Sequence, residues 1–541
     1  MAQVARSLSK ANSSFTFWLG LVMACGAFLR LYQIDSAEVT EPNAAGYMVV
    51  TYNMDLLADW AWDNAERVVR GDWNSDEIKG VFGKAAYGYE MPYYAKPFYD
   101  VQNLITYKIS GGDFRSLIWL TAIWGVLTIP LVGAVACSLW GPIAGIWAAV
   151  SFAVSGSAIG YARDGLAHSA SLFFLCMGLL FFVRLLQRGP GYKWCWASGA
   201  AWGLALTTHP NTLPPIGICL AFAAWREWTA GVSRVTIAKL AALGTGAVMI
   251  VVFFELFYLG LHHFLGDALA VMQDQTRWPT MTYFGQIGSH FGLVMTSPLT
   301  LLEKIYTYIV VFWAFEGIWV WAAVGLASMV GLRGFWHGKR TEILPVALFW
   351  VPLMFFILSQ NTADYRYIAA LLVPATLLGG RGTAWAVELA ARRFAWGGPV
   401  LSMLCAAVFA THIWYLQPLY NAHSAWKEAA TWLVDRGQKR VFSLSSDFNW
   451  MINGIEPLRT GEAVVGESRY IALYRRYPEA ENEHILSLFV PGTLPEYTAY
   501  HLRPIKMMEL QLVQRSPLIE ALAYLPVVGP QVKEMRDLVA A

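Results

Sequence analysis

Ionisable residues that lie between or beside long apolar stretches offer the first indication of chemistry in this sequence. The segment at 34–115 is rich in Asp and Glu and dense in Trp and Tyr, as in the Asp-Trp-Ala-Trp-Asp run at 59–63. Further polar residues flank the apolar stretches; they are Lys96, Arg115, Arg163, Asp164, His168, His209, Asn211, Asp364 and Arg366. Cations beside a hydrocarbon phase would stabilise a leaving phosphate, and a carboxylate would accept the proton of an acceptor hydroxyl. With aromatic rings that stack on sugar faces, these residue types suit a lipid-phosphate substrate.

Each of these residues also has a plain structural explanation. An ionisable side chain near bilayer depth is costly and usually functional, yet a single Arg such as Arg115 or Arg366 could be a snorkelling anchor. The aromatic residues could form an ordinary interfacial belt. Many polar groups contributed to one face by separated segments are harder to explain in this way, which favours a binding or active site.

The composition requires membrane helices to position these groups. Of the 541 residues, 56% are hydrophobic and 14% are charged, whereas soluble proteins carry about a quarter charged residues. The formal net charge of +2 argues against a polyanionic partner, and no nucleic-acid-binding module is found. The six cysteines lie in or at the ends of apolar stretches without metal-ligand spacing, so they are expected to be small core residues.

Hydrophobic runs long enough to cross a bilayer recur along most of the chain. Arg6 and Lys10 precede the first run, at 15–34, which is too long for a signal-peptide core and is expected to be retained. The later runs lie at roughly 116–137, 141–160, 168–186, 194–208, 211–225, 238–260, 306–331, 342–358, 366–380 and 397–416. Together they predict a mainly α, polytopic helical bundle of about eleven spans, with a range of about ten to thirteen.

The distribution of Lys and Arg predicts the orientation of this bundle. Four connections are basic, at 184–193, 226–239, 333–340 and 381–393. All four fall on the side of the N-terminus if the short apolar segment at 99–111 does not cross the membrane. We expect that side to be the cytoplasm, in a multi-pass protein of the inner (cytoplasmic) membrane. The loop at 35–115 and the C-terminus would then be extracytoplasmic.

Two polar regions are expected to fold outside the bilayer. In the first loop, residues 53–70 have helical spacing and are predicted to lie on the membrane surface. After the transmembrane domain at 1–417, the composition changes, and residues 418–541 are predicted to form a small α/β domain. Its expected elements are a helix at 424–436 and strands at 440–446, 485–490 and 508–513.

Several motifs, taken in order, resemble those of the GT-C glycosyltransferases, most closely the bacterial branch related to protein O-mannosyltransferases and the lipid A aminoarabinose transferase. Residues 95–99 (Ala-Lys-Pro-Phe-Tyr) resemble the family's Lys-Pro-Pro-Leu segment, and residues 161–164 (Tyr-Ala-Arg-Asp) resemble its Ser-Arg-x-Ala-x-x-Asp stretch. Residues 203–209 (Gly-Leu-Ala-Leu-Thr-Thr-His) resemble its Gly-Leu-Ala-x-x-Thr-Lys segment. Arg366-Tyr367, followed by Pro374, resembles its Arg-Tyr…Pro helix.

The resemblance implies an integral-membrane enzyme that moves a sugar from a polyprenyl-phosphate donor to a lipid, glycan or protein acceptor on the extracytoplasmic face, with inversion at the anomeric carbon. It makes Lys96 the expected contact to the donor phosphate. The further substrate-binding candidates are Asn43, Tyr47, Arg163, Asp164, His168, His209 and Arg366. Membrane lipid is a second expected partner. Some distant relatives use a divalent cation, so such an ion stays a candidate cofactor without an assigned site. Asp59, Asp63 and Glu66 have helical spacing, but they are interpreted as a solvated helix face and not as metal ligands.

The chain departs from the family pattern where a catalytic acid is expected. The family's Asp-Glu pair falls on Asn43 and Ala44, shortly before Tyr47. The nearby carboxylates that could serve as the base instead are Glu41, Glu38 and Asp35. A second family Asp falls on His168, or on Asp164 if the register shifts.

Three hypotheses follow for the function. The first is the polyprenyl-phosphate-dependent glycosyltransferase. The second is a catalytically degenerate subunit of the same fold, with a structural or lipid- or glycan-binding role in a larger membrane complex, which the Asn43-Ala44 pair motivates. The third is a transporter or channel, which the uneven spans and the lack of paired broken helices make the weakest of the three.

Overall fold

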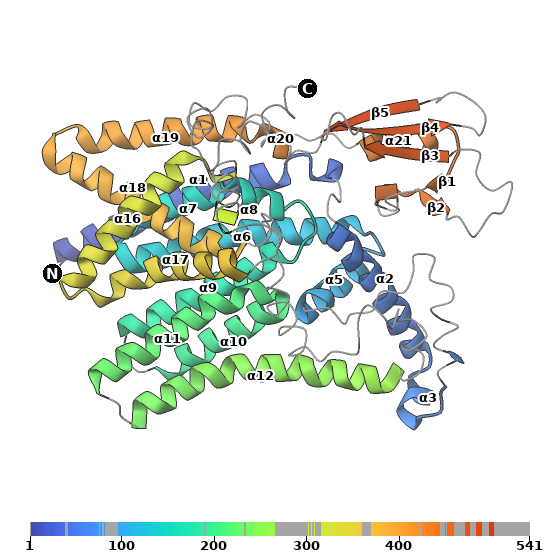
Figure 1. The fold of residues 1–541 in the computed structure, drawn as a ribbon, viewed down its shortest axis with the longest axis horizontal. Coiled ribbons are helices and arrows are strands. Elements are labelled where there is room, and N and C mark those ends of the chain that lie inside the picture. Colours follow the sequence, from blue (N-terminus) through green and yellow to red (C-terminus); the bar gives the residue numbers. More distant parts are fainter. Residues whose placement is uncertain are drawn as a thin grey trace.

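A computed structural model describes the greater part of the chain, and its described residues are 2–37, 42–74, 76–77, 81, 96–188, 191–231, 234–265, 301, 304–305, 308, 315–359, 369–420, 425–443, 449–450, 452–458, 471–476, 483–489 and 497–502. Long helices make up most of the molecule and run roughly side by side (Figure 1). A small sheet lies beyond one end of this bundle, and helices from the first loop lie at the same end. The predicted mainly α, polytopic bundle is confirmed.

Helices occupy the described parts of the predicted apolar runs. The longer ones are α1 (Ala2–Leu31), α6 (Arg115–Trp140), α9 (His168–Arg188), α10 (Tyr192–Thr208), α11 (Leu213–Ala230), α12 (Arg234–Leu265), α16 (Ile318–Trp336), α17 (Ile343–Ser359), α18 (Ala369–Arg393) and α19 (Gly397–Tyr415). Six helices within the described ranges are long and apolar enough to cross a membrane. The chain is therefore a multi-pass membrane protein, while the total of about eleven spans stays a prediction.

One predicted span is divided in two. The run at 141–160 forms α7 (Pro142–Ala153) and the short α8 (Gly156–Tyr161), with an extended Ser155 between them. The hydroxyl oxygen of Ser155 accepts a hydrogen bond from the backbone N–H of Ala158 (3.1 Å), which caps the N-terminus of α8. Hydropathy does not detect this local cap, so the break within the run was not predicted.

Small residues set the distances between the helices. A Cβ atom added to Gly199 of α10 would lie 2.2 Å from the carbonyl oxygen of Leu243 on α12, and one added to Gly380 of α18 would lie 2.4 Å from the backbone nitrogen of Ala148 on α7. Membrane helices lack a hydrophobic driving force between them, so close backbone approach at small residues is a main source of packing energy. These glycines therefore bring the supporting helices of the bundle into contact.

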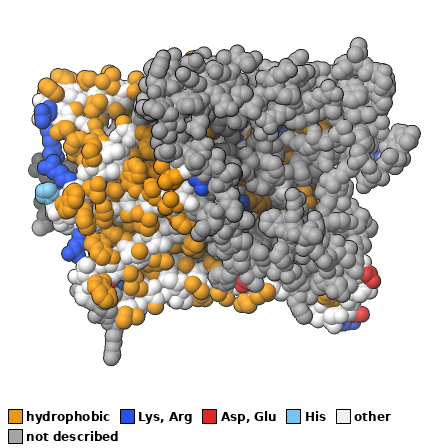
Figure 2. Space-filling model, in the orientation of Figure 1, with side chains coloured by type: hydrophobic (Ala, Val, Ile, Leu, Met, Phe, Trp, Pro, Cys, Tyr) orange, Lys and Arg blue, Asp and Glu red, His pale blue; other side chains and the backbone are white. Residues whose placement is uncertain are grey.

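The outer surface of the bundle is apolar. Large side chains such as Phe17 (67% exposed), Leu256 (62%) and Met403 (71%) point away from the protein. Figure 2 shows hydrophobic side chains spread over the visible helical face, with Lys and Arg gathered at one end. Such a surface suits lipid tails rather than water, since soluble monomers rarely expose apolar patches this continuous.

The described part of the first loop forms three helices. They are α2 (Pro42–Asp63), α3 (Ala65–Arg70) and α5 (Pro97–Ile109), preceded by the 3₁₀ turn η1 (Ile34–Ser36). The predicted helix at 53–70 thus begins earlier and breaks at Asn64. α5 is a separate helix of 13 residues, too short to cross a bilayer, and it packs against α2, α6 and α10.

The residues after α19 build a small α/β unit. After α20 (Gln417–Tyr420), α21 (Ala425–Val434) lies beside strands β1 (Arg440–Ser443), β2 (Glu456–Leu458), β3 (Ile471–Arg476), β4 (Glu483–Phe489) and β5 (Tyr497–Leu502). The strand order is β2-β1-β3-β4-β5. β1 pairs in parallel with β2 and β3, and β4 pairs antiparallel with β3 and β5. The predicted helix is present as α21, and two predicted strands are present as β1 and β4. Strands β2, β3 and β5 were not predicted. The strand expected at 508–513 lies outside the described residues.

Candidate active site

Lys96 stands at the start of α5, where the local sequence determines its position. Pro97 occupies the first helical residue, which suits its fixed φ and missing N–H, and Lys96 is the half-buried residue just before it. The Lys96 ammonium donates a hydrogen bond to the Tyr47 hydroxyl, and its Nζ lies 4.5 Å from the centre of the Tyr47 ring. Two residues assigned to substrate binding from the sequence are therefore in contact.

Tyr99 connects this pair to the turn before α9. Its ring meets the ring of Tyr47 edge-on, with 5.3 Å between the ring centres. Its hydroxyl donates to the carbonyl oxygen of Gly165 (2.6 Å), and its side chain is fully buried. Gly165 has φ +72°, a conformation that glycine adopts at little cost. Tyr99 thus joins α2, α5 and the segment that carries Asp164.

Asp164 and His168 lie on this turn. Oδ1 of Asp164 accepts a hydrogen bond from the backbone N–H of Leu166 (2.9 Å), which shapes the entry into α9. The His168 ring lies 4.8 Å from the Tyr161 ring and 4.5 Å from the His209 ring. All of these side chains are buried. The two histidines, which the sequence separates by a whole helical hairpin, are neighbours.

His209 ends α10 with a defined hydrogen bond. Its Nδ1 accepts from the backbone N–H of Asn211 (3.1 Å), which begins the 3₁₀ turn η2 (Pro210–Thr212). Because Nδ1 acts as the acceptor, the neutral ring carries its proton on Nε2.

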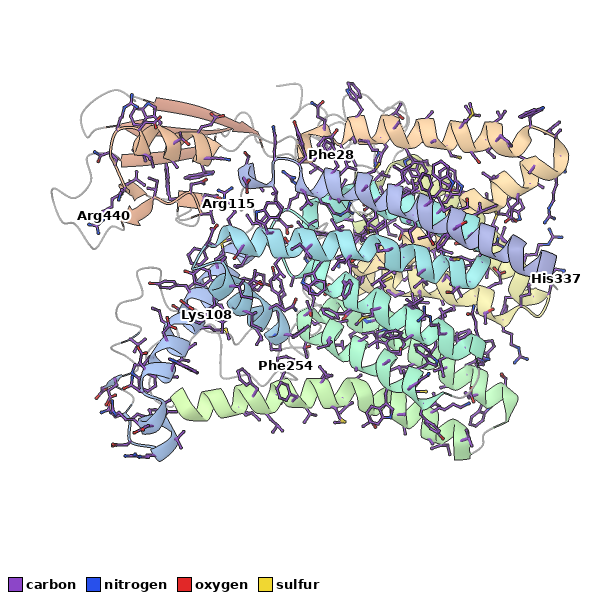
Figure 3. The ribbon with its side chains drawn as sticks, turned by 180° about the vertical axis from the view of Figure 1, so that it is seen from behind. Phe28, Lys108, Arg115, Phe254, His337 and Arg440 are labelled. Atoms are coloured by element: carbon purple, nitrogen blue, oxygen red, sulfur yellow. The ribbon has the colours of Figure 1, made fainter. Side chains whose placement is uncertain are left out.

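These contacts define a continuous polar cluster at the end of the bundle that carries the first loop. Its members are Tyr47, Lys96, Tyr99, Asp100, Asp164, His168 and His209. Figure 3 shows Lys108 near the other end of α5, and Phe254 on α12. The ring of Phe254 lies 5.7 Å from that of Phe98, so α12 contributes apolar packing beside Lys96.

Asp100, like Tyr99, was not among the site residues predicted from the sequence. Its side chain is fully buried, and neither carboxylate oxygen has a hydrogen-bond partner within the described ranges. Burial raises the pKa of the Asp100 carboxyl well above its usual range, although Lys96 opposes this shift. The available signal was an acidic residue four positions after Lys96 in a short apolar helix.

Arg163 contacts the end of the first span rather than the polar cluster. Its guanidinium donates to the carbonyl oxygens of Arg30 (3.1 Å), Tyr32 (2.6 Å) and Gln33 (3.4 Å). Burial lowers the pKa of Arg163 to about 10, so it stays cationic at neutral pH. A cation on the last carbonyls of a helix is favourable, and these bonds hold the chain just before Asp35. Its assignment to the donor phosphate stays a prediction.

Of the three carboxylates proposed as the base, Asp35 lies within the described residues. Asp35 is exposed on η1 and accepts a hydrogen bond from Nε1 of Trp119 (3.3 Å). Glu38 and Glu41 lie outside the described residues, as does Arg366. The backbone of Asn43 belongs to α2, but its side chain is outside the described part.

A metal site is not assigned. Within the described ranges, no group of three or more His, Cys, Asp and Glu residues could hold a metal ion. The divalent cation considered from the family resemblance therefore stays an expectation without a site.

Comparisons with known proteins address the family and the fold. The family model described as dolichyl-phosphate-mannose-protein mannosyltransferase matches residues 98–257, a stretch that begins two residues after Lys96. The solved structure of the oligosaccharyltransferase of Archaeoglobus fulgidus in its apo form aligns over 94% of this chain and 78% of its own, with 12% identity and a TM-score of 0.51. The chain therefore shares the fold of this structure, which agrees with the fold that the motif resemblance implied.

Other solved structures are similar to this chain at lower scores. ArnT from Cupriavidus metallidurans bound to undecaprenyl phosphate aligns over 84% of this chain and 87% of its own, with 12% identity and a TM-score of 0.49. The Archaeoglobus fulgidus enzyme AglB, with an inhibitory peptide and a dolichol-phosphate, gives 14% identity and a TM-score of 0.47 over 82% of this chain. The chain spans 64% of that protein, and 62% of the same organism's oligosaccharyltransferase solved with zinc and sulfate. No curated protein sequence matches the chain significantly.

Proposed function

We propose that this protein is a membrane glycosyltransferase that takes its sugar from a polyprenyl-phosphate carrier. The observation that supports this function best is the setting of Lys96. Its ammonium lies at the first turn of α5, held by the Tyr47 hydroxyl and backed by buried aromatic and polar side chains. A cation in such a partly dehydrated place attracts a phosphate more strongly than one in water does. The matched family model and the GT-C fold support the same reading.

The proposed reaction is one displacement at the anomeric carbon. The bond between that carbon and the phosphate oxygen breaks, and a bond to the acceptor oxygen forms on the opposite face. Lys96 stabilises the charge that develops on the leaving polyprenyl phosphate. A carboxylate takes the acceptor proton, with Glu41 as the first candidate and Glu38 and Asp35 as the next. The hydrogen bonds from Arg163 to carbonyls at the end of α1 fix the position of the chain just before these carboxylates.

The distribution of charge supports an extracytoplasmic position for this site. The connections at 333–340 and 381–393 lie at the end of the bundle opposite α2, α5 and the sheet (Figure 1). His337, which belongs to the first of these connections, marks that end in Figure 3. Basic connections stay on the cytoplasmic side of a membrane. We therefore place the polar cluster, the first loop and the α/β unit on the other side of the inner membrane.

Binding of undecaprenyl phosphate to the purified protein tests the role of Lys96. The variants are Lys96→Ala and Lys96→Arg, with Lys108→Ala as a matched control on the same helix. Lys108 pairs with Asp55 and Asp59 at the other end of α5, so its loss should leave lipid affinity unchanged. We expect Lys96→Ala to weaken binding by about tenfold or more, since a hydrogen bond to a charged group contributes about 1.5–3 kcal/mol, and Lys96→Arg to retain part of the affinity. Equal binding by Lys96→Ala and the wild type would refute the assignment.

A transfer assay separates the enzyme from the non-catalytic subunit that the Asn43-Ala44 pair motivates. Membranes that contain the protein are given polyprenyl-phosphate mannose labelled in the sugar, and labelled acceptor is measured with wild type, Glu41→Gln and Lys96→Ala. Loss of transfer in both variants supports the enzyme. Lys96-dependent lipid binding without transfer in the wild type, together with stable co-purification of other membrane proteins, would favour the subunit.

A further inference from the structure

Asp100 is the most deeply buried acidic side chain of the polar cluster, and the proposed reaction does not use it. Its exposed fraction is 0%, and neither of its carboxylate oxygens accepts a hydrogen bond from the described residues. Burial without hydrogen-bond donors disfavours the charged form, so the pKa of Asp100 lies well above its usual range. Buried ionisable groups with strongly shifted pKa values are concentrated at functional sites.

Lys96 lies one helical turn before Asp100. The backbone N–H of Asp100 donates to the carbonyl oxygen of Lys96 (3.1 Å), which is the N-cap residue of α5. Of the described residues, Lys96 is the charged group whose field acts on Asp100. Lys96 is half-buried whereas Asp100 is fully enclosed, so an arriving phosphate meets the ammonium and not the carboxyl.

We propose that Asp100 is a positioning residue for Lys96 and controls how much of its positive charge is available to an anionic ligand. As a neutral acid, Asp100 leaves the whole ammonium charge to the phosphate. When Asp100 is ionised, its carboxylate attracts the Lys96 ammonium and competes with the phosphate for that charge. This inference rests on the proposed role of Lys96 in binding the donor, and it adds a dependence of that binding on pH.

Other titratable groups lie around α5. Their effects on the pH dependence of binding have to be distinguished from the effect of Asp100. They are Tyr47, Tyr52, Asp55 and Asp59 on α2, Arg115 on α6, Asp164 and His168 at the turn before α9, His209 at the end of α10, and Glu255 on α12. Asp55 and Asp59 pair with Lys108, away from Lys96. Tyr99, beside Asp100, has its hydroxyl bound to the Gly165 carbonyl. A variant that removes only the charge of Asp100 leaves all these groups in place.

The test measures the affinity of the full-length protein for a polyprenyl methyl phosphodiester between about pH 5 and about pH 9, which brackets the pKa values that buried carboxylates reach. A phosphodiester carries one negative charge throughout this range, so its own titration does not contribute. We expect wild-type affinity to fall by about tenfold as pH rises, equivalent to about 1.4 kcal/mol. Asp100→Asn, which cannot ionise, should bind as tightly as the wild type at low pH and show no fall.

Two further variants keep the test decisive if Asp100→Asn does not fold. Lys96→Arg retains a cation and should keep the decline with pH, whereas Lys96→Gln should bind weakly at every pH without that decline. Asp435→Asn, at an exposed position on the α/β unit, is the matched control and should titrate as the wild type does. A pH-independent wild type, or a decline that persists in Asp100→Asn or Lys96→Gln, overturns the inference about Asp100. Absence of any phosphodiester binding by the wild type would instead count against the proposed function.

Discussion

Arg115 and Asn453 join the membrane bundle to the α/β unit across 338 residues of sequence. The guanidinium of Arg115, at the first residue of α6, donates to Oδ1 of Asn453 (2.7 Å) and to the carbonyl oxygen of Ile452 (3.0 Å). Ile452 is buried against apolar residues of the first loop and α6. Figure 3 shows Arg115 between the helices and the sheet residue Arg440. The α/β unit is therefore attached to the base of the first loop.

Replacement of Arg115 should loosen this attachment. Arg115→Ala removes two hydrogen bonds from a charged donor, each worth about 1.5–3 kcal/mol. We expect faster amide hydrogen exchange at 449–458, with little change inside α9 and α10. The control is Arg70→Ala, whose partner Glu66 lies 3.4 Å away on an exposed surface and contributes little. Unchanged exchange at 449–458 in Arg115→Ala would argue against a structural role for these bonds.

Arg30 and Glu316 should behave as a coupled buried pair. Arg30 is fully buried and donates to the carbonyl oxygens of Gly26 (3.0 Å), Phe152 (2.9 Å) and Ala153 (2.8 Å), and Glu316 is a charged partner whose field acts on it. Loss of either charge leaves the other one buried without the opposite charge that acts on it, which is costly. We expect Arg30→Met and Glu316→Gln each to lower the melting temperature in detergent strongly.

The double variant of this pair provides the check. Arg30→Met with Glu316→Gln leaves no unpaired charge, so its loss of stability should be smaller than the sum of the two single losses. Strict additivity would mean that the two side chains stabilise the bundle independently.

The contact between α10 and α12 should depend on Gly199. Alanine at this position places a Cβ 2.2 Å from the Leu243 carbonyl oxygen, which forces the two backbones apart. We expect Gly199→Ala to destabilise the protein by about 1–3 kcal/mol, measured as a lower melting temperature. Gly244→Ala on α12 is the matched control, because a Cβ there meets nothing within 4 Å. Similar losses in both variants would indicate a general effect of helix composition instead.

The burial of Asp100 predicts a specific dependence of stability on pH. The folded state raises the pKa of Asp100, so it binds more protons than the unfolded state above the usual carboxyl pKa of about 3.9. The contribution of Asp100 to stability is therefore largest below that value and falls by up to about 1.4 kcal/mol per pH unit until the folded pKa is reached. Asp100→Asn should gain stability relative to the wild type as pH rises through this window. Parallel pH profiles of the melting temperature would contradict the prediction.

The sequence by itself determined the class of the protein and the positions of its helices. Apolar runs far longer than a strand predict membrane helices, since the bilayer requires every backbone polar group to be bonded within its own segment. The order of short motifs around Lys96, Arg163 and His209 was enough to indicate the GT-C fold. The α/β unit was only partly predicted, because strands as short as β2 leave almost no periodic signal.

Only the tertiary structure decided which polar side chains meet. His168 and His209 are adjacent because α9 and α10 form a hairpin, and Lys96 meets Tyr47 because α5 folds back against α2. Nothing local in the sequence distinguishes Arg163, which binds the end of α1, from a ligand-binding arginine. Asp100 was missed for the same reason: an acid in a short helix is solvated in most proteins, and here the packing of α2, α6 and α10 around α5 encloses it. Burial depends on many distant contacts at once, so local periodicity and residue type do not determine it.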